Sequence, residues 1–193
     1  METAKNFMNT SDFISQRQFD EHIKLYQGYV GKVNEITGDL ASFQGRASAN
    51  ATYSEYRGLK KGETYALDGV IFHELYFPLL GNTQTEPGPD TKAIFDSQFR
   101  GYDNWKADFK ACGISARGWA LLIYEQRTGT YRNILLDLHN EGLVCGGFPL
   151  IIMDVYEHAY FIDYGTDKST YIDRFIGSLR WDLVERKISG IKK

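Results

Sequence analysis

The chain has 193 residues, enough for one compact domain or two small ones around a shared core, and its 42% hydrophobic content, including 15% aromatic residues, can fill that core. The formal net charge of -3 comes from well-mixed acidic and basic residues, which argues against a nucleic-acid partner and against binding to an anionic membrane. Two cysteines, far apart in the chain, are too few for a disulfide framework or a cysteine-based metal site.

The N-terminal segment, METAKNFMNTSDF, contains no apolar stretch of the kind that directs secretion. The longest apolar runs elsewhere, ALLIY and FPLIIM, are far too short to span a bilayer. A cytoplasmic location without membrane attachment is therefore expected.

A long helix is predicted from Ser15 onward, because Ser15 and Gln18 have the spacing of a capping box and an amphipathic stretch follows. His22, Tyr26 and Tyr29 fall at positions i, i+4 and i+7, so one face of this helix carries a histidine and two tyrosines. Residues 38–53 are rich in Gly, Ser, Ala and Asn, which favours a loop or a weak helix.

The run YALDGVIFHELYFPLL at residues 65–80 is apolar on nearly all sides, as expected of a buried helix, and carries His73 at its centre. This helix and the one before it are expected to form a hairpin. Residues 81–91 follow with two prolines, two glycines and no large apolar side chain, which is typical of a linker. We therefore predict an N-terminal helical hairpin domain over residues 1–83 and a C-terminal α+β domain over residues 84–193.

The C-terminal half alternates between helical and strand-like patterns. A helix is predicted over residues 92–111 and another over residues 171–187, each with an apolar face. Between them lie three strand-like runs, the first two joined by a hairpin turn at Arg127-Thr128-Gly129-Thr130. The runs cover residues 119–125, 131–138 and 150–155. The predicted fold class is α+β, with a three-stranded antiparallel sheet among helices.

Three of the four histidines fall in segments predicted to be buried: His22, His73 and His158. Asp154 precedes His158 by four residues, so the two side chains can meet on one ion if a strand end turns into a helix there. Three imidazoles and one carboxylate suit iron, manganese or zinc, and do not suit copper(I) or an iron–sulfur cluster. Taken singly, each buried histidine is more often a hydrogen-bonded core residue, and Asp154 with Glu157 could form a surface turn with an ion pair.

The segment DVYEHAYFIDY at residues 154–164 resembles the D-x-W-E-H-A-Y-Y signature of iron/manganese superoxide dismutases. The following YIDRF at residues 171–175 and Arg180-Trp181-Asp182 resemble the C-terminal helix of that family, and a looser resemblance reaches back to about Ser15. The resemblance implies an enzyme that converts superoxide to dioxygen and hydrogen peroxide with one iron or manganese ion per subunit. The implied metal ligands, with a solvent molecule as the fifth, are His22, His73, Asp154 and His158.

The resemblance also implies which residues surround the metal. Family members hydrogen-bond the solvent ligand with a glutamine or, in some branches, a histidine. Gly69 stands where a glutamine can occur, so His139 is the candidate donor and Asn140 the next. Tyr29 matches the gateway tyrosine of the substrate channel and Trp119 the aromatic wall of the pocket; core packing is the alternative explanation for both.

Several residues depart from the family pattern. Tyr26 occupies the position of a second histidine, and Tyr29 falls seven residues after His22 instead of eight, as if a π-bulge had been lost. Tyr156 replaces the signature tryptophan, and Phe161 replaces a tyrosine that bonds the missing histidine across the dimer interface.

The glutamate that bridges to the ligand histidine of the other subunit in the family is retained here as Glu157, which implies a homodimer through Glu157 and His158. Three hypotheses follow: a dismutase, a metal-binding relative without efficient dismutase activity, and a structural dimer with incidental histidines. Metal content distinguishes the third hypothesis from the others, and turnover of superoxide distinguishes the first two. The same ligand set binds iron and manganese, so the sequence does not choose between them.

Overall fold

The computed structural model describes residues 1–81 and 86–191. The predicted domain boundary between residues 83 and 84 lies outside the described residues. No helix in these two ranges is both long enough and apolar enough to cross a membrane.

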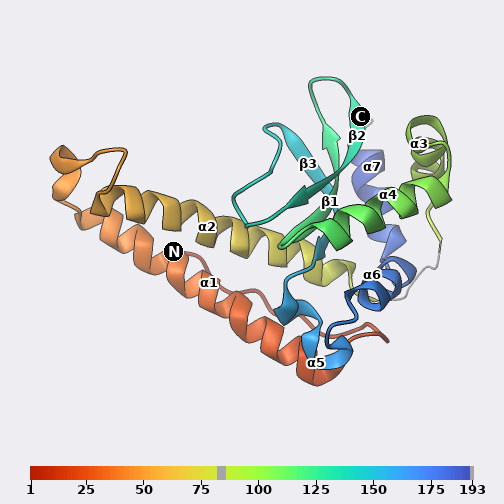
Figure 1. The fold of residues 1–193 in the computed structure, drawn as a ribbon, viewed down its shortest axis with the longest axis horizontal. Coiled ribbons are helices and arrows are strands. Elements are labelled where there is room, and N and C mark those ends of the chain that lie inside the picture. The colour runs from red at the N-terminus through yellow and green to blue at the C-terminus, as the bar shows by residue number, and fades with distance from the viewer. Residues whose placement is uncertain (82–85, 192–193) are drawn as a thin grey trace.

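Two long antiparallel helices, α1 (Gln16–Ser42) and α2 (Glu55–Tyr76), form the predicted hairpin. Their connected ends, with the short 3-10 helix η1 (Gly45–Ser48), project beyond the rest of the molecule (Figure 1). Helix α1 thus continues past residue 38, where a loop or a weak helix was expected, and α2 begins ten residues before the predicted start at residue 65. A 3-10 helix, η2 (Phe77–Leu79), extends α2 toward the next segment.

Only half of the predicted capping box at Ser15 is present. The Ser15 hydroxyl accepts a hydrogen bond from the Gln18 backbone N–H at 3.1 Å, as an N-cap should. The Ser15 N–H, however, donates to a carboxylate oxygen of Asp163 at 2.6 Å, far along the chain. The Gln18 side chain is consequently free for another contact, described below.

The C-terminal half contains a three-stranded antiparallel sheet with strand order β2-β1-β3, which confirms the predicted fold class. The strands are β1 (Trp119–Glu125), β2 (Thr130–Leu136) and β3 (Gly147–Asp154). The turn between β1 and β2 has Gly129 at a φ of 67°, a conformation that favours glycine. In the register, Trp119 at the start of β1 faces Asp154 at the end of β3.

Two predicted helices are each broken in two. The helix expected over residues 92–111 is α3 (Pro89–Phe99) followed by α4 (Tyr102–Ser115), because Arg100 and Gly101 both have positive φ. The helix expected over residues 171–187 is α6 (Lys168–Gly177) followed by α7 (Trp181–Ile191). Here the interruption arises because Leu179 forms an isolated β-bridge with Leu80.

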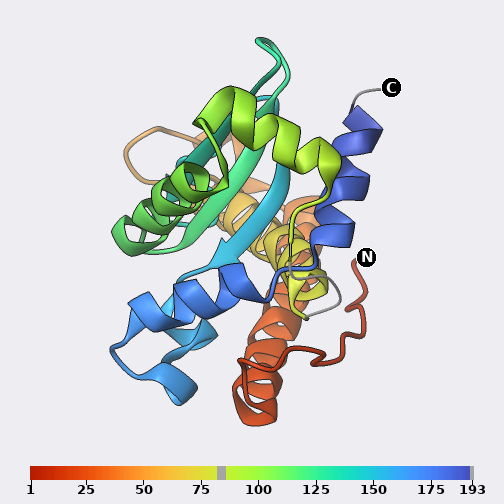
Figure 2. The same ribbon diagram turned by 90° about the vertical axis from the view of Figure 1, so that its right-hand side faces the viewer.

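Helices pack against the sheet from more than one side (Figure 2). Helix α4 packs on β1 and β2, α2 contacts β3, and α7 packs against α3 and β3. Between β3 and α6 the chain forms a 3-10 helix, η3 (Glu157–Ala159), and a single turn of helix, α5 (Phe161–Tyr164), both lying against α1. This crossing brings the end of β3 beside the hairpin.

Candidate metal centre

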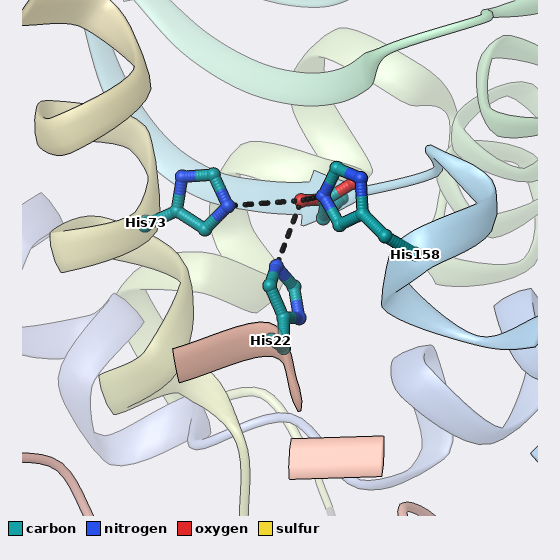
Figure 3. A group of neighbouring side chains, drawn as sticks. His22, His73 and His158 are labelled. Atoms are coloured by element: carbon teal, nitrogen blue, oxygen red, sulfur yellow. Dashed lines mark hydrogen bonds and ion pairs between the residues drawn. The ribbon is translucent and has the colours of Figure 1, made fainter. Parts of the chain in front are cut away.

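His22, His73, Asp154 and His158 meet where the hairpin, the end of β3 and η3 come together. One ligand atom from each residue lies within 4.8 Å of all the others. Figure 3 shows the three imidazoles converging from α1, α2 and the η3 segment. Their Nε2 atoms lie 3.2 Å (His22), 3.5 Å (His73) and 3.2 Å (His158) from the same Asp154 oxygen, Oδ2.

His73 is oriented by its own helix. Its Nδ1–H donates to the Gly69 carbonyl at 2.5 Å, one turn earlier in α2, and this leaves the Nε2 lone pair directed into the cluster. The residue is fully buried, and burial lowers the pKa of His73 to about 3, so the ring is neutral. Among the described residues, His73 Nε2 has no hydrogen-bond partner.

Asp154 has one oxygen fixed and one directed at the imidazoles. Its Oδ1 accepts the Tyr156 backbone N–H at 2.9 Å, while Oδ2 faces the three rings. Burial alone would raise the pKa of this carboxyl, but the charge and hydrogen bond of His158 and the hydrogen bond of His22 outweigh it and hold the pKa well below its usual range. The backbone is fixed as well, since the Tyr171 hydroxyl donates to the Asp154 carbonyl at 2.8 Å.

The two remaining histidines differ in burial. His22 is 2% exposed, and burial lowers its pKa. The His158 side chain is 26% exposed, which makes it the outermost member of the cluster. Because η3 has only three residues, its own helical bonds are too few to hold His158 in place.

His139, Trp119 and Tyr29 form a hydrogen-bonded chain beside the cluster. The indole N–H of Trp119 donates to His139 Nδ1 at 2.9 Å, and because indole can only donate, the His139 proton must be on Nε2. Nε2–H faces the Tyr29 hydroxyl oxygen at 2.8 Å. His139 is fully buried, and burial lowers its pKa to about 4. The structure therefore joins two predicted site residues, Tyr29 and His139, directly to each other.

Helix α1 is continuous through Tyr29, with no π turn within the described part of the chain, in line with the predicted loss of a bulge. The Tyr26 hydroxyl does not bond to any member of the cluster: it donates to Glu74 at 2.9 Å and accepts the Lys5 backbone N–H at 2.9 Å. Tyr156 lies 5.2 Å from the His139 ring, measured between centroids, and its hydroxyl donates to the Asp137 carbonyl at 3.3 Å.

Two of the alternatives considered at the sequence level have a structural outcome. Asn140, the second candidate for the solvent donor, donates instead to the Thr64 hydroxyl at 2.8 Å. A side chain at Gly69 would meet the Tyr29 ring, because a Cβ there would lie 3.0 Å from Tyr29 Cγ. A glutamine at residue 69 would therefore require the Tyr29 ring to shift.

Sequence reasoning missed two residues near the cluster, Tyr65 and Gln18. The Tyr65 ring lies 4.5 Å from that of His139, and its phenol contributes, after burial, to raising the pKa of both Tyr29 and Tyr156. Gln18 is fully buried and contacts the segment that carries His158. Helical spacing could have found both, since Tyr65 precedes His73 by two turns and Gln18 precedes His22 by one.

The donor set fits a metal ion on two observations. A buried, neutral imidazole with an unpaired Nε2 is costly unless something binds that atom. Three imidazoles around one carboxylate oxygen are also the ligand types that iron, manganese and zinc accept. The fold and the cluster thus define an α+β protein with a site for one divalent or trivalent metal ion.

Comparison with known proteins identifies the family. Residues 87–187, more than half of the chain, match the family model for the C-terminal domain of iron/manganese superoxide dismutases. The chain is 40% identical over 184 residues to "Superoxide dismutase [Fe]" of Aquifex aeolicus (strain VF5), covering 93% of this chain and 86% of that protein. It is also 40% identical over 164 residues to "Superoxide dismutase [Mn] 2" of Halobacterium salinarum, covering 84% and 80%. The chain belongs to the iron/manganese superoxide dismutase family.

Proposed function

We propose that this protein is a superoxide dismutase that uses one iron or manganese ion held by His22, His73, Asp154 and His158. The observation that carries the proposal is the unpaired, inward-facing Nε2 of His73 within a cluster of three imidazoles and one carboxylate. When bound, the ion supplies one-electron redox chemistry, accepting an electron from one superoxide and returning an electron to the next. Relatives of both the iron and the manganese type match the chain, so the proposal includes either metal.

The protein's own part in this reaction is to bind the ion, exclude bulk water and hold a proton. Formation of hydrogen peroxide consumes two protons, and the Tyr29 hydroxyl is the group we assign to hold one of them. His139 Nε2–H donates to the Tyr29 oxygen, so the phenol proton is left for a partner other than His139, and the Tyr65 phenol is one such neighbour. Burial raises the pKa of Tyr29 above its ordinary value, which keeps the phenol protonated at neutral pH.

We further propose that the active protein is a homodimer joined through Glu157 and His158. Glu157 is exposed, and a hollow of about 300 Å³ beside it is lined by Glu21, His158, Phe161 and Ile162. Phe161 and Ile162 are 46% and 44% exposed, and a second copy would cover this apolar surface. Sedimentation of the Glu157→Ala protein tests the assignment: the wild type should sediment as a dimer and the variant as a weaker dimer or a monomer.

We also propose that the protein is located in the cytoplasm.

The experiment that tests the function combines metal analysis with superoxide turnover. The wild type should contain about one iron or manganese ion per chain and disproportionate superoxide, while His73→Ala should lose both. Ile71→Ala is a matched control, because Ile71 lies on the same helix, is 41% exposed and is not part of the cluster. Bound metal without turnover would favour a metal-binding relative without efficient dismutase activity. A protein that binds no metal would refute both the dismutase and the metal-binding relative.

A further inference from the structure

The segment that carries His158 is interrupted at the point where it passes α1. The 3-10 helix η3 ends at Ala159 and α5 begins at Phe161. In a continuous α-helix the His158 carbonyl would accept the N–H of Ile162, four residues later. In this protein a side chain from α1 stands between these two groups.

That side chain is Gln18. Its Nε2 donates to the His158 carbonyl at 2.5 Å, and its Oε1 accepts the Ile162 N–H at 3.0 Å. The two partners fix the orientation of the amide, because a carbonyl requires the NH₂ group and an N–H requires the oxygen. Two hydrogen bonds from the Gln18 amide therefore take the place of the single helical bond between His158 and Ile162. The Gln18 side chain is fully buried.

Gln18 also connects two members of the cluster. It lies one helical turn before His22 on α1, and α1 is anchored at the same end by the Ser15 N–H to Asp163 bond and by the Tyr164 hydroxyl, which donates to the Phe13 carbonyl at 2.5 Å. The rings of His22 and His158 lie 4.9 Å apart between centroids. A shift of the Gln18 contact would consequently move His158 relative to His22.

We propose that Gln18 is a positioning residue for the metal site, holding the outermost histidine, His158, in place through its backbone. This inference rests on the proposed function, since it assumes that His158 binds the metal. Few other side chains could serve: Asn is too short to span the two backbone groups, and Glu cannot donate to the carbonyl when ionised. Loss of the contact should therefore loosen the metal more than it destabilises the empty protein.

The test uses the full chain in metal-loaded and metal-free form, with the variants Gln18→Met and Gln18→Glu. Gln18→Met keeps the length of the side chain and removes both hydrogen bonds; Gln18→Glu keeps the acceptor for Ile162 and removes the donor. We expect both loaded variants to release metal to EDTA about 10 to 100 times faster than wild type, the range seen when groups that support metal ligands are removed. The absorption or electron paramagnetic resonance spectrum of the bound metal should change as well.

The matched control is Gln16→Met, because Gln16 is an exposed glutamine on the same helix whose amide donates to Asp20 at 2.7 Å, away from the cluster. It should leave both the release rate and the spectrum unchanged. The gain in melting temperature on adding metal should shrink in the Gln18 variants, whereas a purely structural role would lower the melting temperatures of the loaded and empty forms equally. If Gln18→Met does not fold, Gln18→Glu decides on the same measurements.

Release rates within twofold of wild type with unchanged spectra would overturn the inference. An equal loss of melting temperature in the metal-loaded and metal-free forms would overturn it as well. If the wild type is metal-loaded and active while the Gln18 variants are unaffected, only this inference fails. If the wild type binds neither iron nor manganese, the proposed function fails together with the inference.

Discussion

His73 and His158 contribute to one cluster, yet the protein holds them by different means. His73 lies in the 22-residue helix α2, is fully buried, and is oriented by the carbonyl of Gly69 one turn away. His158 lies in a three-residue 3-10 helix, keeps 26% of its side chain exposed, and is fixed by Gln18, 140 positions away in the chain. The inner side of the site thus depends on local helix geometry, and the outer side on a tertiary contact.

Replacing each histidine by alanine should separate these two roles most clearly. Both His73→Ala and His158→Ala should reduce metal content and turnover by more than about 100-fold, because each removes a ligand. The empty proteins should differ: His73→Ala opens a hole in the core and should lower the free energy of unfolding by about 2 kcal/mol, whereas His158→Ala at the edge should cost less than about 0.5 kcal/mol. Urea denaturation of the metal-free proteins checks this, and equal losses would contradict the distinction.

His139 extends the comparison, since it lies in the turn after β2 and is held by Trp119 of β1. His139→Ala should lower turnover about 10 to 100-fold with metal still bound, because Tyr29 loses its donor and Trp119 its acceptor. His139→Gln should be milder, as one amide can accept from the indole and donate to the phenol. Fast-mixing measurements of superoxide decay, normalised to metal content, compare the turnover of the two variants. A His139→Gln variant as slow as His139→Ala would disprove this explanation.

The buried His139 should also make the metal-free protein sensitive to acid. Burial lowers the pKa of His139 to about 4, below the value of about 6.5 expected in the unfolded chain. Between these two pH values His139 binds a proton in the unfolded chain but not in the folded protein. The contribution of His139 to the free energy of unfolding therefore falls as the pH decreases through this window, by up to about 3 kcal/mol, and does not change with pH above it. Urea denaturation at several pH values, with His139→Gln as the comparison, should show a shallower acid loss in the variant.

A pair of glycines on α2 gives the smallest expected effect. A Cβ at Gly69 would meet the Tyr29 ring at 3.0–3.2 Å, so Gly69→Ala should displace Tyr29 and lower turnover several-fold. Gly58 has open space around its Cβ position, so Gly58→Ala should leave turnover unchanged and stabilise the protein by about 0.5–1 kcal/mol. Turnover and thermal unfolding of both variants are the measurements; a Gly69→Ala protein with wild-type turnover would show that Tyr29 tolerates the shift.

The same division explains what could be predicted from the sequence. The hairpin, the three strands and their turn follow local patterns, and the position of His73 within a buried helix followed from its apolar neighbours. The break between α6 and α7 did not, because it arises from the bridge between Leu179 and Leu80, which the helical periodicity around Leu179 does not reveal. Gln18 was read as half of a capping box, the usual local explanation, whereas its amide bonds the backbone beside His158.

The spread of the cluster along the chain has a consequence for biosynthesis. His22 and Asp154 are 132 positions apart, and η3 follows Asp154. A ribosome therefore exposes α1 and α2, with two imidazoles, long before it releases the carboxylate and the last imidazole. No chain that ends before His158 has the full set of donors, so a stable metal complex can form only after the β3 segment and η3 have emerged and folded back onto the hairpin. The choice of metal is consequently made by a nearly complete polypeptide, from whatever ions are available at that moment.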